Sequence, residues 1–155
     1  MSTTLFRNCL VVRDARSPFN PTRQDILVDG DNVAAIEPAG NLKAADEIID
    51  ADGKLAAAGM INGHFHSWDH YIKGRVENLP MELMMPYLRP AQPLQLTDRQ
   101  VYLRTMAGAI ESLRTGATTI VDDMSLGPSL NRDHAEAALQ AYEDSGVRAY
   151  LGFSM

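Results

Sequence analysis

The sequence lacks several features that would point to an exported, membrane-bound or nucleic-acid-binding protein. Cys9 is its single cysteine, so no intramolecular disulfide can form and a reducing compartment is the default. No lysine- or arginine-rich cluster accompanies the net charge of −6, which argues against a nucleic-acid surface. No run approaches the ~20 apolar residues of a membrane helix, and Arg7, Asn8, Arg13 and Asp14 interrupt the N-terminus before an export signal could form. We therefore expect a cytoplasmic protein without a nucleic-acid or membrane partner.

Residues 1–58 show the short apolar runs and turn residues that are typical of β-structure. Residues 5–12 are rich in strand formers, and a strand–turn–strand pattern over 26–36 contains the turn signal Asp-Gly-Asp-Asn. A further strand followed by a turn is predicted at 47–50. No helical periodicity occurs in this part, so we expect strands and at least one hairpin here.

From residue 59 the pattern changes to strands that alternate with helices. Strands are predicted at 60–66, 117–123 and 147–153. A long irregular connection over 67–96 follows the first of them, and Pro80 is placed to open a short helix within it. Alternation of strands and helices indicates parallel β/α units and an α/β fold.

Two helices of this second part carry clear start and stop signals. Thr97-Asp98-Arg99-Gln100 fits a capping box, and Gly116 fits a left-handed cap at the end of the same helix. Asn131 and Gly146 are placed to begin and end the second helix. Apolar residues at helical spacing predict the inward faces: Tyr102, Leu103, Met106, Ile110 and Leu113 in the first helix, and Ala135, Ala138, Leu139 and Tyr142 in the second.

The most informative residues are His64 and His66, which end a short apolar run beginning at Gly59. Because residues i and i+2 of a strand face the same side, the two imidazoles are expected to project together. Two convergent neutral imidazoles are the start of a transition-metal site. Such a site usually takes three or four protein ligands, so the pair is expected to supply only part of one.

The order of these motifs resembles the entry to the amidohydrolase superfamily. The resemblance is carried by Asp-Gly-Asp-Asn-Val-Ala-Ala-Ile-Glu, Ile-Ile-Asp-Ala-Asp-Gly-Lys, Gly-Met-Ile-Asn-Gly-His-Phe-His and, further on, Glu-Ser-Leu-Arg-Thr-Gly-Ala-Thr-Thr-Ile-Val-Asp. It implies the N-terminal part of a small β-sandwich over 1–58, followed over 59–155 by the first three β/α units of a metal-dependent (β/α)₈ barrel. Because such a barrel takes about 250 residues, we interpret the chain as a fragment of a longer protein.

By this resemblance His64 and His66 are metal ligands, and the catalytic residues and remaining ligands are expected beyond residue 155. Asn62 precedes the Gly-His-Phe-His motif, as in the cytosine-deaminase, chlorohydrolase and adenosylhomocysteine-deaminase-like branch, which holds one metal ion. We expect one divalent metal ion and favour zinc. Iron, cobalt and manganese are alternatives, since imidazole binds several of these metals.

The implied function is a metal-dependent hydrolase that acts on a C–N or related C–X bond of a small molecule through metal-activated water. The expected partners are a small-molecule substrate, the rest of the barrel on the same gene product or a companion fragment, and further copies of the protein in a homo-oligomer.

Three further residues are candidates for substrate binding. Trp68 lies just past the predicted end of the first barrel strand, on the side where barrel active sites are built. His70 could be a third ligand or a substrate contact, and Met84 lies in the connection that walls the substrate pocket in similar enzymes. For Asp122 and Asp123, at the end of the next strand, we favour hydrogen-bonded carboxylates that support the barrel rim.

Two other interpretations stay open at this point. One is a binuclear amidohydrolase of the cyclic-amidase or aminoacylase type, against which Asn62 argues modestly. The other is a non-catalytic fragment or an interaction module. The sequence names neither the substrate nor the metal.

Overall fold

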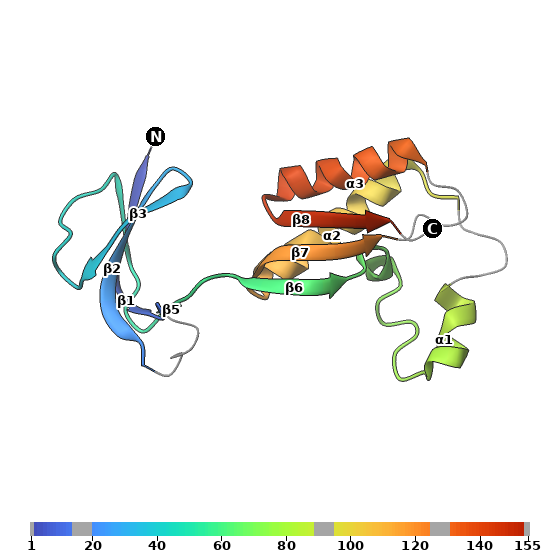
Figure 1. Cartoon of the computed structure of the whole chain (residues 1–155), viewed down its shortest axis with the longest axis horizontal. Helices are drawn as coiled ribbons and strands as arrows, with labels where there is room; N and C mark the ends of the chain where they lie inside the picture. Colours follow the sequence, from blue (N-terminus) through green and yellow to red (C-terminus); the bar gives the residue numbers. More distant parts are fainter. Residues whose placement is uncertain (1, 14–19, 89–94, 125–130, 154–155) are drawn as a thin grey trace. The chain divides into compact units, whose positions relative to one another are not determined.

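The computed structural model describes residues 2–13, 20–88, 95–124 and 131–153. The chain divides into two compact units, Met1–Ala58 and Gly59–Met155, which are described separately (Figure 1). Among the described residues, no helix has both the length and the apolar character that crossing a membrane requires.

The first unit is built on one five-stranded sheet. Its strands are β1 (Thr3–Val11), β2 (Thr22–Asp29), β3 (Asn32–Pro38), β4 (Glu47–Asp50) and β5 (Leu55–Ala56). The order is β3-β2-β1-β4, with β5 also paired to β1. The predicted hairpin is confirmed as the antiparallel pair β2–β3, and Gly30 takes the positive φ of its turn. Cys9, Val11 and Ala51 form the buried apolar cluster of this unit.

Asp25, on β2, has a fully buried side chain that bonds to the backbone of two other segments of this unit. Its two oxygens accept hydrogen bonds from the backbone amides of Asn8 (3.0 Å) and Gly40 (2.8 Å). Asn8 has a positive φ of 63°, at the point where the β1–β2 register shifts. Burial by itself raises the pKa of Asp25, but the backbone hydrogen bonds outweigh it and the pKa lies below its ordinary value. Asp25 therefore remains an anion that ties the irregular part of β1 to the turn near Gly40.

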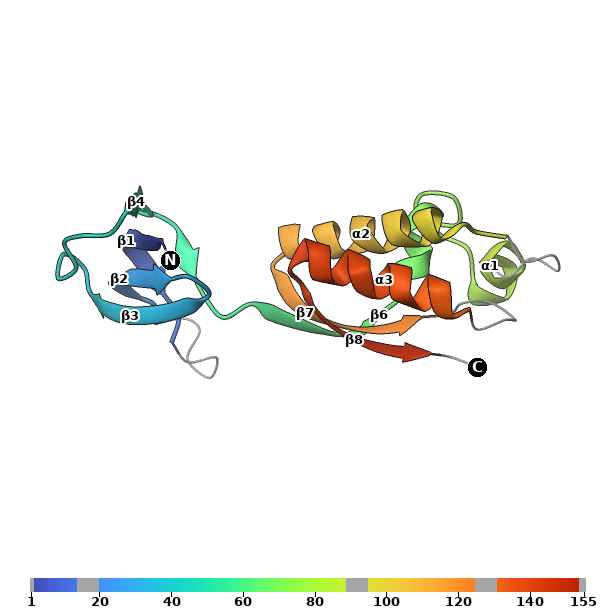
Figure 2. The ribbon, with the colours of Figure 1, turned by 90° about the horizontal axis from the view of Figure 1, so that it is seen from above.

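The second unit is a parallel sheet with helices on one face. Its elements are β6 (Met60–Phe65), the 3₁₀ helix η1 (Ser67–Tyr71), α1 (Met81–Leu88), α2 (Asp98–Arg114), β7 (Ala117–Met124), α3 (Arg132–Ser145) and β8 (Arg148–Phe153). The strands run parallel in the order β6-β7-β8. Helices α2 and α3 lie side by side and cover the same face of the sheet (Figure 2). The predicted alternation of parallel strands and helices is thereby confirmed.

The helix ends follow the predicted capping chemistry. The Thr97 hydroxyl accepts a hydrogen bond from the backbone N–H of Gln100, and the side-chain oxygen of Gln100 accepts one from the backbone N–H of Thr97. Together these two bonds form the capping box of α2. Asn131 accepts from the amide of Asp133 at the start of α3, and Gly146 ends α3 in the left-handed conformation. These local signals determined the element boundaries because each is satisfied within one helical turn.

The predicted inward faces of the helices were wrong at three large residues. Leu103, Ile110 and Leu139 are 48%, 47% and 51% exposed. The buried positions are instead mostly small: Val101, Thr105, Gly108, Ala109 and Ser112 in α2, and Ala138, Ala141 and Tyr142 in α3. Val101, Ala109 and Ala138 pack in buried clusters with Ile120 and Met124 of β7, so these residues face the sheet in place of the three large ones.

Candidate metal centre

His64 and His66 lie at the C-terminal end of β6 and their rings converge. The ring centroids are 4.6 Å apart, with the planes at 80° to each other. Phe65, between them, packs instead toward the buried cluster that contains Ala109 and Ile120. The alternation of side chains along the strand therefore separates a histidine pair from an apolar anchor on the opposite face.

A backbone contact from the neighbouring strand orients His66. Its Nδ1 lies 2.9 Å from the carbonyl oxygen of Asp123, at the end of β7. Because a carbonyl oxygen can only accept, Nδ1 must carry the proton of this hydrogen bond. A neutral His66 then presents the lone pair of Nε2, which is the arrangement that metal-ligating histidines commonly adopt. The ring of His64 makes no hydrogen bond with the part of the chain that the structure describes.

The pair suits a divalent metal ion but does not form a full ligand set. Imidazole nitrogens bind zinc and related metals at about 2.0–2.1 Å, and two rings this close can reach the same ion. Within residues 2–13, 20–88, 95–124 and 131–153 there is no group of three His, Cys, Asp or Glu residues able to hold a metal. The histidine pair therefore fits a metal as two ligands of a larger set.

The structure brings Trp68 to the histidine pair but turns His70 away from it. The ring of Trp68 lies 6.0 Å from that of His66. His70 packs against α2, where its Nε2 is 3.4 Å from a carboxylate oxygen of Glu111. Lys73 also pairs with Glu111, and this bond is the main cause of the lowered pKa of the Glu111 carboxyl. In this geometry, His70 joins η1 to α2 and does not lie beside His64 and His66 as a third metal ligand.

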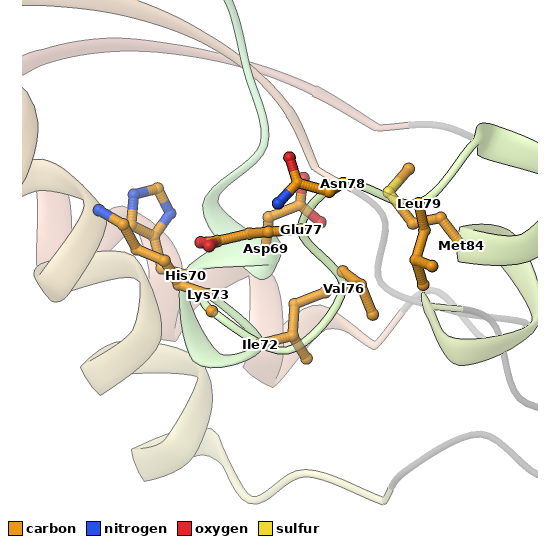
Figure 3. Close-up of a pocket in the computed structure, with 10 residues that line it drawn as sticks. Asp69, His70, Ile72, Lys73, Val76, Glu77, Asn78, Leu79 and Met84 are labelled. Carbon is orange, nitrogen blue, oxygen red and sulfur yellow. The ribbon is translucent and has the colours of Figure 1, made fainter.

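His70 and Met84 both line a pocket of about 370 Å³ that follows β6 in the chain. Its polar lining includes Asp69 and Glu77, while Leu79 and Met84 contribute an apolar end (Figure 3). Burial raises the pKa of the Asp69 carboxyl, and its Oδ1 has no hydrogen-bond partner among the described residues. The pocket can thus accept a molecule with both an apolar part and hydrogen-bonding groups.

Asp122 has the hydrogen-bonded role that the sequence favoured. Its Oδ1 accepts from the amide of Ser67 (2.9 Å) and its Oδ2 from the hydroxyl of Tyr142 (2.7 Å). Sequence reasoning missed the Tyr142 contact, the Asp123 carbonyl that orients His66, and the pairing of Glu111 with His70. No local signal could have revealed these contacts, because each joins residues far apart in the chain.

The sequence and fold resemble parts of known amidohydrolase-type enzymes. No family model matches the chain. A 5-methylthioadenosine/S-adenosylhomocysteine deaminase of Pyrococcus horikoshii is 32% identical over 97% of this chain and 33% of that protein. A 5'-deoxyadenosine deaminase of Methanocaldococcus jannaschii is 35% identical over 88% of this chain and 31% of that protein. The chain spans about a third of the length of the curated relatives that it matches.

Solved structures show the same fold. A triazine hydrolase from Arthrobacter aurescens superposes with a TM-score of 0.81 at 23% identity, covering 99% of this chain and 36% of that one. A mutant atrazine chlorohydrolase from the same species, complexed with zinc and atraton, has a TM-score of 0.75 at 23% identity, covering 96% and 35%. These matches confirm the predicted resemblance to the N-terminal portion of amidohydrolase-superfamily enzymes and the predicted α/β fold.

Proposed function

We propose that this chain supplies two metal ligands, His64 and His66, to a metal-dependent hydrolase that acts on a C–N bond of a small molecule, of the deaminase type. The observation that carries the proposal is the convergent histidine pair, with His66 held through Nδ1 so that Nε2 is available. The similarity to adenosine-type deaminases over most of the chain supports it. When bound, a divalent ion supplies an activated water and polarises the electrophile.

The chain's own residues prepare this site before any ion binds. Strand β6 aims both rings to one side, and the Asp123 carbonyl sets the tautomer and the orientation of His66. The remaining ligands and the general acid/base are expected from further barrel strands, since the described part of the chain holds no third ligand. We propose zinc as the ion. A zinc-bound structural neighbour supports this choice.

Metal analysis of the full-length protein tests this proposal. We expect one zinc per chain in the wild type, and loss of the metal together with at least ~100-fold loss of activity in His64→Ala and His66→Ala. Ammonia release from 5'-methylthioadenosine and 5'-deoxyadenosine measures the activity. His134→Gln is the matched control, because His134 lies at the start of α3 and contacts Leu96 and Asp98 instead. Unchanged metal content in both alanine variants would contradict the proposal, and two ions per chain would favour the binuclear alternative.

We further propose that the pocket beside η1 binds the part of the substrate that does not react. Its volume of about 370 Å³ lies in the usual range for small-molecule sites, about 300–1,000 Å³. Met84→Ala should raise KM several-fold with little change in kcat, because uniform binding is lost. Met81→Ala is the control, since Met81 is exposed on the same helix and does not line the pocket. A Met84→Ala variant that lowers kcat at unchanged KM would contradict this role.

Trp68, beside His66, and His70, in the pocket wall, remain predicted substrate contacts. The homo-oligomeric state, the cytoplasmic location and the companion part of the barrel also remain predictions.

A further inference from the structure

A buried carboxylate connects helix α3 to the segment that carries His66. Asp122 is fully buried at the end of β7. A buried charge is costly unless it is hydrogen-bonded, and Asp122 accepts from the Tyr142 hydroxyl at 2.7 Å and from the Ser67 amide at 2.9 Å. Both are charge-assisted hydrogen bonds, which are stronger and geometrically stricter than neutral ones.

Tyr142 is held firmly enough to act as the far end of this connection. It is 3% exposed and belongs to the buried cluster with Ala109, Ile120 and Val147. Burial, followed by the charge of Asp122, raises the pKa of Tyr142 far above its ordinary value. The phenol therefore stays protonated throughout the neutral range and continues to donate to the carboxylate.

The other end of the connection is directly at the histidine pair. Ser67 follows His66 in the chain, and Asp123 follows Asp122. Two hydrogen bonds therefore join the same pair of dipeptides: Ser67 N–H to the Asp122 carboxylate, and His66 Nδ1–H to the Asp123 carbonyl. The first bond holds the amide that directly follows His66, and the second holds the His66 ring against the next residue of β7.

We propose that Asp122 and Tyr142 are positioning residues that hold His66 in the Nδ1–H tautomer with Nε2 directed at the metal. This inference rests on the proposed role of His66 as a ligand, and it adds that helix α3 contributes to the metal site without touching it. Loss of the support lets the 66–67 segment shift, so that the Asp123 carbonyl no longer selects one tautomer and one ring orientation.

Zinc affinity of the full-length protein, measured by competition with a chromophoric chelator, tests the proposal. Removing the partners that orient a ligand typically weakens metal binding about 10–100-fold. We expect about 10-fold for Tyr142→Phe, which keeps the ring packing, and a larger loss for Asp122→Ala. Asp122→Asn should weaken zinc binding about as much as Tyr142→Phe, because its one amide oxygen can still accept from the Ser67 amide but its NH₂ group cannot accept the proton of the Tyr142 hydroxyl.

Tyr102→Phe is the matched control, since it removes a phenol–carboxylate bond to Asp144 on the surface, at 2.8 Å. A second readout is the tautomer of His66 in the metal-free protein, from long-range ¹H–¹⁵N NMR of histidine-labelled samples. We expect Nδ1–H in the wild type and Tyr102→Phe, and a mixture of tautomers in Tyr142→Phe.

The inference is overturned if Tyr142→Phe binds zinc as tightly as Tyr102→Phe and keeps a single His66 tautomer. Should Asp122→Ala fail to fold, Tyr142→Phe and Asp122→Asn still decide the question. If His66→Ala itself leaves zinc binding unchanged, the proposed function fails instead, so the two failures are distinguishable.

Discussion

Gly108 lies in the middle of α2, where Phe65 and His70 pack so closely that a larger residue would not fit. A Cβ added there would lie 2.9 Å from Cζ of Phe65 and 3.1 Å from Cε1 and Nδ1 of His70. Ordinary helix propensity favours alanine over glycine by about 1 kcal/mol. Forcing extra volume into a packed site costs about 1–3 kcal/mol. We therefore expect Gly108→Ala to lower the free energy of unfolding by up to about 2 kcal/mol. At a helix position with free space, the same substitution would raise the free energy of unfolding.

The neighbouring residue supplies the reference for this experiment. Ala107 is exposed in the same helix, so Ala107→Gly measures the propensity difference alone, about 1 kcal/mol. Urea unfolding of the full-length protein, followed by circular dichroism, gives both values. In a double-mutant cycle, His70→Ala should recover part of the loss in Gly108→Ala, because it removes one of the two contacting rings. A Gly108→Ala variant that is about 1 kcal/mol more stable than the wild type would refute the packing argument.

Further outcomes are expected for Asp25, for Thr97 and for removal of the metal. Asp25→Ala should lower the free energy of unfolding by about 1–3 kcal/mol, because the backbone amides of Asn8 and Gly40, both in part-buried hydrogen bonds, lose their acceptor. Because the pKa of Asp25 is lowered in the folded protein, its contribution to the free energy of unfolding is present above about pH 4 and is lost as pH falls through the folded-state pKa. Urea titrations at about pH 3 and pH 6 should show this loss in the wild type and not in Asp25→Asn. Thr97→Ala should lower the free energy of unfolding by about 1 kcal/mol, and Thr97→Ser by much less, since the serine hydroxyl can still accept from the backbone N–H of Gln100. Equal losses in the two variants would contradict a stabilising role of this capping bond. Chelator treatment should lower the melting temperature of the wild type but leave that of His66→Ala unchanged, which calorimetry can check.

Much of the second unit was predictable because its signals are local. The capping box at Thr97, the cap at Asn131 and the left-handed Gly146 each act within one turn, and all were confirmed. The inward faces of the helices were harder to predict. Hydrophobic periodicity shows that a helix is amphipathic, but the partner decides which residues are buried. Leu103 and Leu139 are exposed, whereas Val101, Ala109 and Ala138 belong to the buried clusters that α2 and α3 form with β7.

The candidate site divides in the same way. The spacing of His64 and His66 on a strand was enough to place both rings on one side, since the alternation of side chains is a property of the extended backbone itself. His70, four residues further on, could not be placed from spacing, because its ring turns toward Glu111 on a helix that begins much later in the chain.

The sequence by itself determined that parallel β/α units follow an all-β unit and that a histidine pair ends the strand β6. Only the tertiary structure decided which nitrogen of His66 is available, because that depends on a carbonyl 57 residues away. It likewise decided that Tyr142 on α3 supports the segment beside His66 through Asp122. Local periodicity is encoded by neighbouring residues, whereas these contacts exist only once β6, β7 and α3 pack together.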